Sequence, residues 1–161
     1  MKTITLIRHG KSSWNFDVSD KNRPLKSRGI NDANLVANQF VKQNEIPNKI
    51  FSSPANRALS TCKIFTKNFN LSEEEINIVE ALYDFGGDSV IGFIQALPNN
   101  CDDIMIFGHN HAFTSISNIF GSIFIDNLPT SGLVKIKFEI DNWKDLKKGT
   151  TELIIIPKEL K

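Results

Sequence analysis

The first stretch that could do chemistry is Arg8-His9-Gly10, which directly follows the apolar and β-branched run Thr3–Ile7. That run predicts a buried strand, and in an open α/β sheet ligands bind outside the carboxyl ends of the strands. Arg8 offers a planar fork of donors suited to phosphate or carboxylate. His9 can act as a nucleophile or as an acid or base near neutral pH, and Gly10 allows a tight turn. An ordinary strand end with a chance Arg-His pair has the same three residues, so the rest of the chain decides.

Polar groups follow two further predicted strands. Lys49–Ser53 leads to Arg57 near the start of a helix, where backbone N–H groups also favour an anion, and Asp103–Phe107 leads to His109. If these strands are parallel, their ends meet at one edge of the sheet. Two arginines and two histidines would then share one cavity. Four cationic or potentially cationic groups with few acids suit a dianionic phosphoryl group.

Alternating strand and helix patterns predict the fold that would position these groups. We expect an α/β three-layer sandwich with a mostly parallel central sheet, helices on both faces and an antiparallel C-terminal strand pair. Ser13–Ser27 is interpreted as a surface loop beside the site. The expected helices span Ser27–Asn44, Ala55–Asn68, Asp88–Leu97 and His111–Phe120. Beyond the three strands named above, Ile76–Val79 is expected to form a strand, and Leu133–Ile140 and Glu152–Ile156 the antiparallel pair.

Length and composition bound the class of protein. The 161 residues predict a single domain over residues 1–161, and 40% hydrophobic with 23% charged residues is typical of a globular protein. The formal charge of +1 gives no reason to expect binding to nucleic acid or to an acidic membrane surface. The two cysteines, Cys62 and Cys101, are too few for a disulfide framework. Cys62 is interpreted as a buried thiol in a helix, and Cys101 as an incidental residue of a polar loop. Without a long apolar span, the chain is expected to be cytoplasmic, with no membrane partner.

Several stretches resemble a known family in register. RHGKSSWN (8–15), SPANRALST (53–61) and GHN (108–110) are similar to the three signatures of the histidine phosphatase superfamily, the phosphoglycerate mutase-like group. The run from Arg23 to Gly29 and LPTSG (128–132) further resemble its small SixA-type phosphohistidine phosphatase branch. The resemblance covers most of the chain, and three signatures in order are far more specific than Arg-His-Gly alone.

The resemblance implies a catalytic set. His9 would be the nucleophile that takes the phosphoryl group and passes it to water, while Arg8, Arg57 and His109 would hold the phosphoryl oxygens. Such catalysis works by positioning and electrostatic stabilisation. Because His9 must be neutral to attack, its other ring nitrogen should donate to a fixed acceptor.

Further residues are weaker candidates for contact with phosphate or substrate. They are Asn15, Gly10 and Asn110. No cofactor is implied. His109 and His111 invite a metal site, but the chain has only three histidines and no cluster of acids at ligand spacing, so none is predicted. His111 is interpreted as the start of a helix, with the mouth of the site as the alternative.

The general acid is open. Larger relatives place a carboxylate after the third strand, where this chain has Asp84, with Glu80 nearby; Asp84 could equally be a solvated turn residue. An ester that leaves as an alkoxide needs a proton donor, whereas imidazole leaving from a phosphoramidate needs one less. A weak or absent acid would therefore favour phosphohistidine.

The sequence predicts a metal-independent phosphatase that acts on protein phosphohistidine. Its partner would be a phosphorylated protein, because the chain lacks the long insertions with which larger relatives cover small substrates. One alternative is a phosphatase for small phosphoesters. The other is a non-catalytic module that binds phosphate or a phosphoprotein. Three phenylalanines near the fourth predicted helix, Phe113, Phe120 and Phe124, are interpreted as core.

Overall fold

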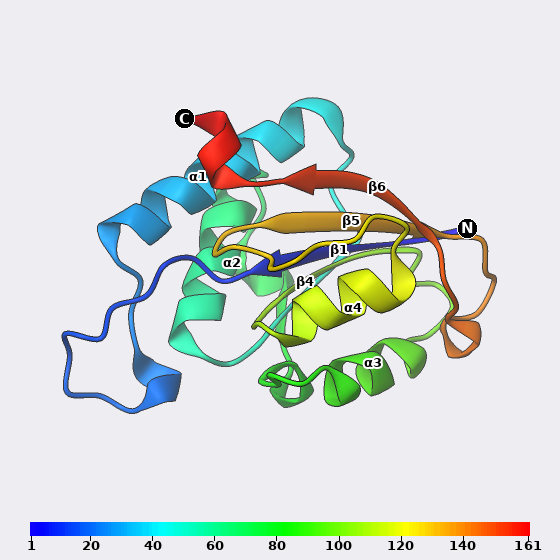
Figure 1. Cartoon of the computed structure of the whole chain (residues 1–161), viewed down its shortest axis with the longest axis horizontal. Coiled ribbons are helices and arrows are strands. Elements are labelled where there is room, and N and C mark those ends of the chain that lie inside the picture. The colour runs from blue at the N-terminus through cyan, green and yellow to red at the C-terminus, as the bar shows by residue number, and fades with distance from the viewer.

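The computed structural model describes residues 1–161 and has a six-stranded mixed sheet between two layers of helices (Figure 1). The strands are β1 (Lys2–Arg8), β2 (Lys49–Ser52), β3 (Ile76–Ile78), β4 (Asp103–Gly108), β5 (Leu133–Phe138) and β6 (Thr150–Ile155). The helices are α1 (Ser27–Gln43), α2 (Asn56–Asn68), α3 (Asp88–Gln95) and α4 (Ala112–Phe120). Short 3₁₀ turns span Asp20–Asn22, Glu73–Glu75, Glu80–Leu82, Trp143–Asp145 and Pro157–Leu160.

The sheet order is β3-β2-β4-β1-β5-β6. The first four strands in that order pair in parallel, while β5 is antiparallel to both β1 and β6. The expected mostly parallel sheet with an antiparallel C-terminal pair is therefore confirmed. The carboxyl ends of β1, β2 and β4 lie at one edge, because parallel neighbours run in the same direction.

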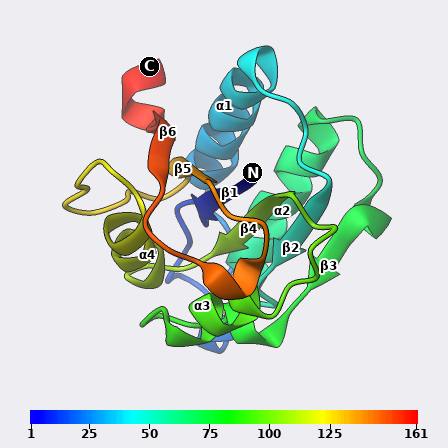
Figure 2. The same ribbon diagram turned by 90° about the vertical axis from the view of Figure 1, so that its right-hand side faces the viewer.

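Alternating side chains divide the core into two apolar clusters, one on each face of the sheet. Ile4 and Leu6 of β1 belong to the cluster that contains residues of α3 and α4. Ile7, on the opposite face, belongs to the cluster that contains residues of α1 and α2. Figure 2 shows these two helix pairs on either side of the strands. A strand buried on both faces explains the nearly continuous apolar run before Arg8.

Two sequence interpretations outside the site are wrong. Phe124 is predicted in the core, but 79% of its surface is exposed, because α4 ends at Phe120 and the chain then turns outward through Gly121. Cys101 looks like a polar-loop residue, yet it is 3% exposed and packs in the core, where its carbonyl accepts a hydrogen bond from buried Trp143. No helix has the length and apolar content to span a bilayer.

A close contact between backbones fixes α1 against the turn after β1. A Cβ on Gly29 would lie 2.3 Å from the Lys11 carbonyl oxygen, and one on Gly10 would lie 2.9 Å from the Gly29 carbonyl oxygen. The Lys26 N–H also donates to the Lys11 carbonyl. Only glycine permits this approach, which holds the start of α1 beside the residues that follow β1.

We predict that Gly29→Ala destabilises the protein and that Gly92→Ala does not. The alanine methyl at position 29 would collide with backbone, at an expected loss of about 1–3 kcal/mol in the free energy of unfolding. At position 92, inside α3, a Cβ meets nothing within 4 Å, so the helix should gain about 0.5–1 kcal/mol. Urea denaturation of both variants measures this; equal stabilities would contradict the close approach at Gly29.

Candidate active site

The register between β1 and β4 places the two predicted histidines side by side. Arg8 pairs with Gly108, and the His9 N–H then donates to the Gly108 carbonyl at 3.0 Å. The residues that follow, His9 and His109, have ring centroids 5.4 Å apart. Parallel neighbours thus bring together residues a hundred positions apart in the sequence.

Arg57 completes the group from the first turn of α2. It is 2% exposed, and its Nε lies 3.3 Å from His9 Nε2. Arg8, at the end of β1, donates from Nη1 to the Leu128 carbonyl at 2.8 Å. Burial and the Arg57 charge lower the pKa of Arg8, so the two guanidinium groups are close enough to repel each other. Arg8, His9, Arg57 and His109 are hereafter the Arg-His cluster.

His9 is held as a neutral imidazole whose Nε2 is unprotonated and accepts a hydrogen bond from Arg57 Nε. Its Nδ1 lies 2.7 Å from the Gly10 carbonyl oxygen, which can only accept, so Nδ1 carries the proton and Nε2 has the lone pair. The Gly10 N–H donates to Thr61 Oγ1, which fixes this acceptor. Burial lowers the pKa of His9 to about 4; the Gly10 hydrogen bond opposes the shift, and Arg57, Arg8 and Arg23 add to it. The imidazole is therefore uncharged at neutral pH.

His109 is fixed by Ser53 and covered by aromatic rings. Its Nε2 lies 2.8 Å from the Ser53 hydroxyl, which accepts from the Ala55 N–H. This contact fixes the plane of the ring, and Nδ1 has no hydrogen-bond partner within the protein. Tyr83 and Phe85 have ring centroids 5.4 and 5.0 Å from the His109 ring, which is fully buried. Burial lowers the pKa of His109 to about 3, and the neighbouring His9 and Arg57 lower it further.

Buried polar atoms without a hydrogen-bond partner are concentrated around this cluster. They include Arg8 Nε, Arg23 Nη1, His109 Nδ1 and Ser131 Oγ. Ser131 adjoins the cluster, since its N–H lies 3.1 and 3.0 Å from the carbonyls of Arg8 and His9. Buried polar groups in folded proteins are nearly always paired, so this concentration of donors marks a site for an oxygen-rich anion.

Sequence reasoning missed a carboxylate in the site. Asp20 Oδ2 accepts from Arg57 Nη2 at 3.0 Å and from the Tyr83 hydroxyl at 2.6 Å, and Asp20 Oδ1 accepts from Arg23 Nε at 3.3 Å. Burial would raise the pKa of Asp20, but the Tyr83 hydrogen bond and Arg57 outweigh it and hold that pKa below its usual value. Arg23 belongs to the run from Arg23 to Gly29 that resembles the SixA-type branch. No local sequence pattern, however, indicates the hydrogen bond between Asp20 and Tyr83.

The three weaker candidates for phosphate binding, Gly10, Asn15 and Asn110, make other contacts in the structure. Gly10 uses its N–H on Thr61 and its carbonyl on His9. Asn15 is exposed on the loop, where its N–H donates to Ser13 Oγ. The Asn110 side chain caps α4, accepting from both the N–H and the hydroxyl of Thr114.

The acid candidates likewise lie outside the cluster. Asp84 caps α3. Its two carboxylate oxygens accept hydrogen bonds at 3.0 to 3.2 Å from four backbone N–H groups, those of Gly86, Gly87, Ser89 and Val90. Glu80 is 75% exposed and pairs with Lys21 at 3.2 Å. His111 is exposed and directly precedes α4, as the sequence interpretation expects.

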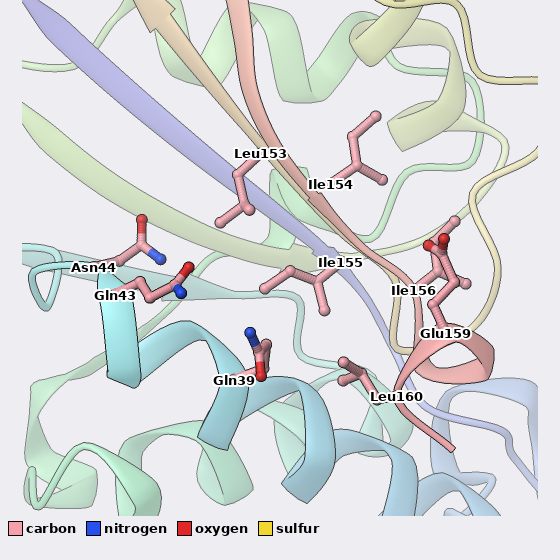
Figure 3. A pocket seen from close by; sticks show the side chains of 9 residues that line it. All are labelled: Gln39, Gln43, Asn44, Leu153, Ile154, Ile155, Ile156, Glu159 and Leu160. Atoms are coloured by element: carbon pink, nitrogen blue, oxygen red, sulfur yellow. The ribbon is translucent and has the colours of Figure 1, made fainter.

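Neither a metal cluster nor the pocket in Figure 3 competes with this site. No group of three or more His, Cys, Asp or Glu residues could hold a metal ion. The pocket in Figure 3 lies between α1, the edge strand β6 and the C-terminal turn, away from the Arg-His cluster. Its lining residues are Gln39, Gln43, Asn44, Leu153, Ile154, Ile155, Ile156, Glu159 and Leu160.

Known proteins share the sequence pattern of this chain. The sequence model of the histidine phosphatase superfamily (branch 1) matches residues 4–92, more than half of the chain. An uncharacterised protein of Mycobacterium tuberculosis (strain CDC 1551 / Oshkosh) is 23% identical over 158 residues, which cover 92% of this chain and 96% of that protein.

Solved structures give the same fold. The protein histidine phosphatase SixA complexed with tungstate has a TM-score of 0.83 at 21% identity, with 99% of both chains covered. A candidate phosphohistidine phosphatase SixA from Agrobacterium tumefaciens has a TM-score of 0.73 at 23% identity, covering 84% of this chain and 90% of that one. The fold is therefore phosphoglycerate mutase-like.

We predict that the buried histidines make the protein less stable in acid. Their pKa values fall from 6.5 to about 4 for His9 and about 3 for His109, so the unfolded chain binds more protons below about pH 6.5. The stability contributed by the neutral rings is fully present above that pH and is lost as the pH falls towards the folded-state values.

Urea denaturation of the wild type and of His109→Asn at about pH 7 and about pH 4.5 tests this. Asp103, whose pKa burial raises to about 6, titrates in the same window in both proteins, so the comparison isolates His109. The variant should lose less stability on acidification. Equal losses would contradict the prediction.

Proposed function

The chain belongs to the histidine phosphatase superfamily (branch 1), and on that premise we propose that it hydrolyses protein phosphohistidine through a covalent phosphohistidine on His9. The observation that carries the proposal is His9 itself. It is a buried, neutral imidazole whose Nε2 faces Arg57, in a cluster where buried polar atoms of Arg8 and His109 have no partner.

The first step transfers the phosphoryl group to the enzyme. His9 Nε2 attacks phosphorus, the bond from phosphorus to the substrate's imidazole nitrogen breaks, and the leaving imidazole keeps that electron pair and takes a proton from water. Arg8, Arg57 and His109 would bind the equatorial oxygens, where charge is spread in the transition state. The Gly10 carbonyl stabilises the positive charge that develops on the His9 ring through its bond to Nδ1.

The second step returns the enzyme to its starting state. A water oxygen attacks phosphorus, the bond to His9 Nε2 breaks, and inorganic phosphate and neutral His9 are released, with the extra proton going to solvent. The chemistry uses only this chain's residues and water; members of the superfamily are generally metal-independent phosphatases.

The acid-base character of the site supports phosphohistidine as the substrate. Asp20 is the carboxylate in contact with Arg57, and its lowered pKa keeps it ionised at neutral pH, where it cannot give up a proton. Asp84 and Glu80 are engaged elsewhere. An alkoxide leaving group, with a conjugate acid of very high pKa, needs such a proton, whereas imidazole needs it far less.

Exposed apolar side chains beside the site support a protein as the carrier of the phosphoryl group. Trp14, Phe16, Val18 and Phe85, the apolar rim, are 74%, 59%, 46% and 47% exposed. Trp14 stacks on Arg23 at 3.4 Å and Phe85 packs on His109, so these two side chains border the cluster, and Phe16 and Val18 follow Trp14 on the same loop. Exposed apolar side chains gathered near a site are typical of macromolecular recognition.

We predict that His9→Ala abolishes phosphohistidine hydrolysis because it removes the nucleophile. The wild type and the variant are assayed with EDTA on a phosphocarrier protein phosphorylated on histidine and on p-nitrophenyl phosphate. The wild type should release phosphate faster from the protein, and the variant should release it from neither substrate. Turnover of the ester alone would identify a small-ester phosphatase. Phosphate binding without turnover of either substrate would identify a binding module.

We predict that the apolar rim acts on protein substrates only. In Phe16→Ser/Val18→Ser, kcat/KM for the phosphocarrier protein should fall about tenfold, the effect of losing about 1.4 kcal/mol of contact, whereas kcat/KM for free phosphohistidine should stay within about twofold. Phe124→Ser removes a ring that is 79% exposed and lies outside the rim, and it is the control. Equal kcat/KM values for the double variant and the control on the protein substrate would refute a docking role.

A further inference from the structure

Asp20 accepts hydrogen bonds from Arg57, the residue proposed above to bind the phosphoryl oxygens. The 3₁₀ turn Asp20–Asn22 lies over the start of α2, where Arg57 Nη1 donates to the Asp20 carbonyl at 2.7 Å and Nη2 to its carboxylate at 3.0 Å. The remaining Arg57 donor, Nε, faces His9 Nε2. All three nitrogens of this guanidinium are therefore engaged within the protein.

The same carboxylate is held from three sides. Arg23 Nε and the Tyr83 hydroxyl bind it in addition to Arg57. Tyr83 comes from the segment before α3, which contacts the loop that carries Asp20. Asp20 thus stays beside Arg57 because its neighbours fix it there, although its side chain is 44% exposed.

A fixed carboxylate beside Arg57 opposes the binding of a second anion. A phosphoryl group bonded to His9 Nε2 would share the Arg57 guanidinium with Asp20, and like charges at such short range repel strongly in a partly buried site. Tight binding of ground-state phosphate does not accelerate the reaction, and it slows the release of product. A carboxylate that weakens it is therefore useful to a phosphatase.

We propose that Asp20 is a specificity-determining residue that lowers the affinity of the site for free phosphate; this inference rests on the proposed function. The opposite role is a clamp that orients Arg57 for the anion. The two roles predict opposite signs when the charge is removed: loss of a repelling carboxylate tightens phosphate binding, whereas loss of a clamp weakens it.

Isothermal titration of inorganic phosphate into the wild type, Asp20→Asn and Asp17→Asn measures that sign. The Asp20→Asn variant keeps the shape of the side chain without its charge, so Kd should fall at least about tenfold, as expected for removal of one like charge at this range. Asp17 lies on the same loop, is exposed and makes no side-chain hydrogen bond or ion pair, so its variant reports the general effect of one negative charge and should change Kd less than about twofold. A Kd for Asp20→Asn that is equal to or higher than that of Asp17→Asn overturns the proposal.

Tyr83→Phe is the second test and keeps the charge of Asp20. It removes the hydroxyl that holds Oδ2, so the carboxylate can move away from an incoming anion, and Kd should fall by about two- to threefold. If Asp20→Asn does not fold, as judged by circular dichroism, a rise in Kd for Tyr83→Phe overturns the proposal instead.

Titration needs no turnover, so the two proposals can fail separately. A wild type that hydrolyses phosphohistidine, with no tightening in Asp20→Asn, overturns the role of Asp20 and leaves the proposed function standing. Tightening in a protein that hydrolyses nothing supports the role of Asp20 at an anion site and overturns the catalytic function on which its use in product release depends.

Discussion

The parallel pairing of β1 with β4 is the constraint on which the site depends. It aligns Arg8 with Gly108, so that His9 and His109 leave the sheet together and their rings meet. A shift of one residue in this register would turn every side chain of β1 to the opposite face of the sheet. The apolar clusters on the two faces prevent such a shift, because Ile4 and Leu6 would have to exchange places with Ile7. Core packing thereby fixes the distance between the two imidazoles.

The electrostatics of the site follow from the same burial. Dehydration and three nearby arginines make a charged imidazole costly at His9, so the ring keeps the lone pair that a nucleophile needs. Positive charge concentrated around neutral rings attracts a phosphoryl dianion, and Asp20 offsets part of that charge. The fold places this one carboxylate on Arg57 rather than on His9, where it would raise the pKa of the nucleophile.

Sequence could predict the parts of this site that depend on strand ends. Arg8, His9, Arg57 and His109 each end a strand, follow one or begin a helix, and parallel pairing brings such positions together whatever the details of the loops. The sequence could not predict side-chain hydrogen bonds. An Asp after a strand can serve as an acid or as a helix cap. The structure shows that Asp84 caps α3, because its carboxylate accepts from the N–H groups that follow it. The bond between Asp20 and Tyr83 joins residues 63 positions apart on two irregular segments, for which no periodicity exists to be read. Phe124 shows the converse error, since an apolar residue beyond a helix end has no periodic partner to place it inside.

The loop that carries Asp20 is held by backbone contacts at its base and is exposed at its tip. At the base, Ser12 bridges to Leu25, and Gly29 packs against the backbone of Lys11, so the two ends of the loop are fixed side by side. At the tip, Phe16 faces solvent. Asp20 lies between them and reaches across Arg57 to Tyr83. An anion that approaches His9 must therefore compete with Asp20 for Arg57. The hydrogen bonds broken in this competition are made by side chains and are not those of the sheet. The sheet fixes where the chemistry can occur, and the contact between these two segments sets how strongly an anion is held there.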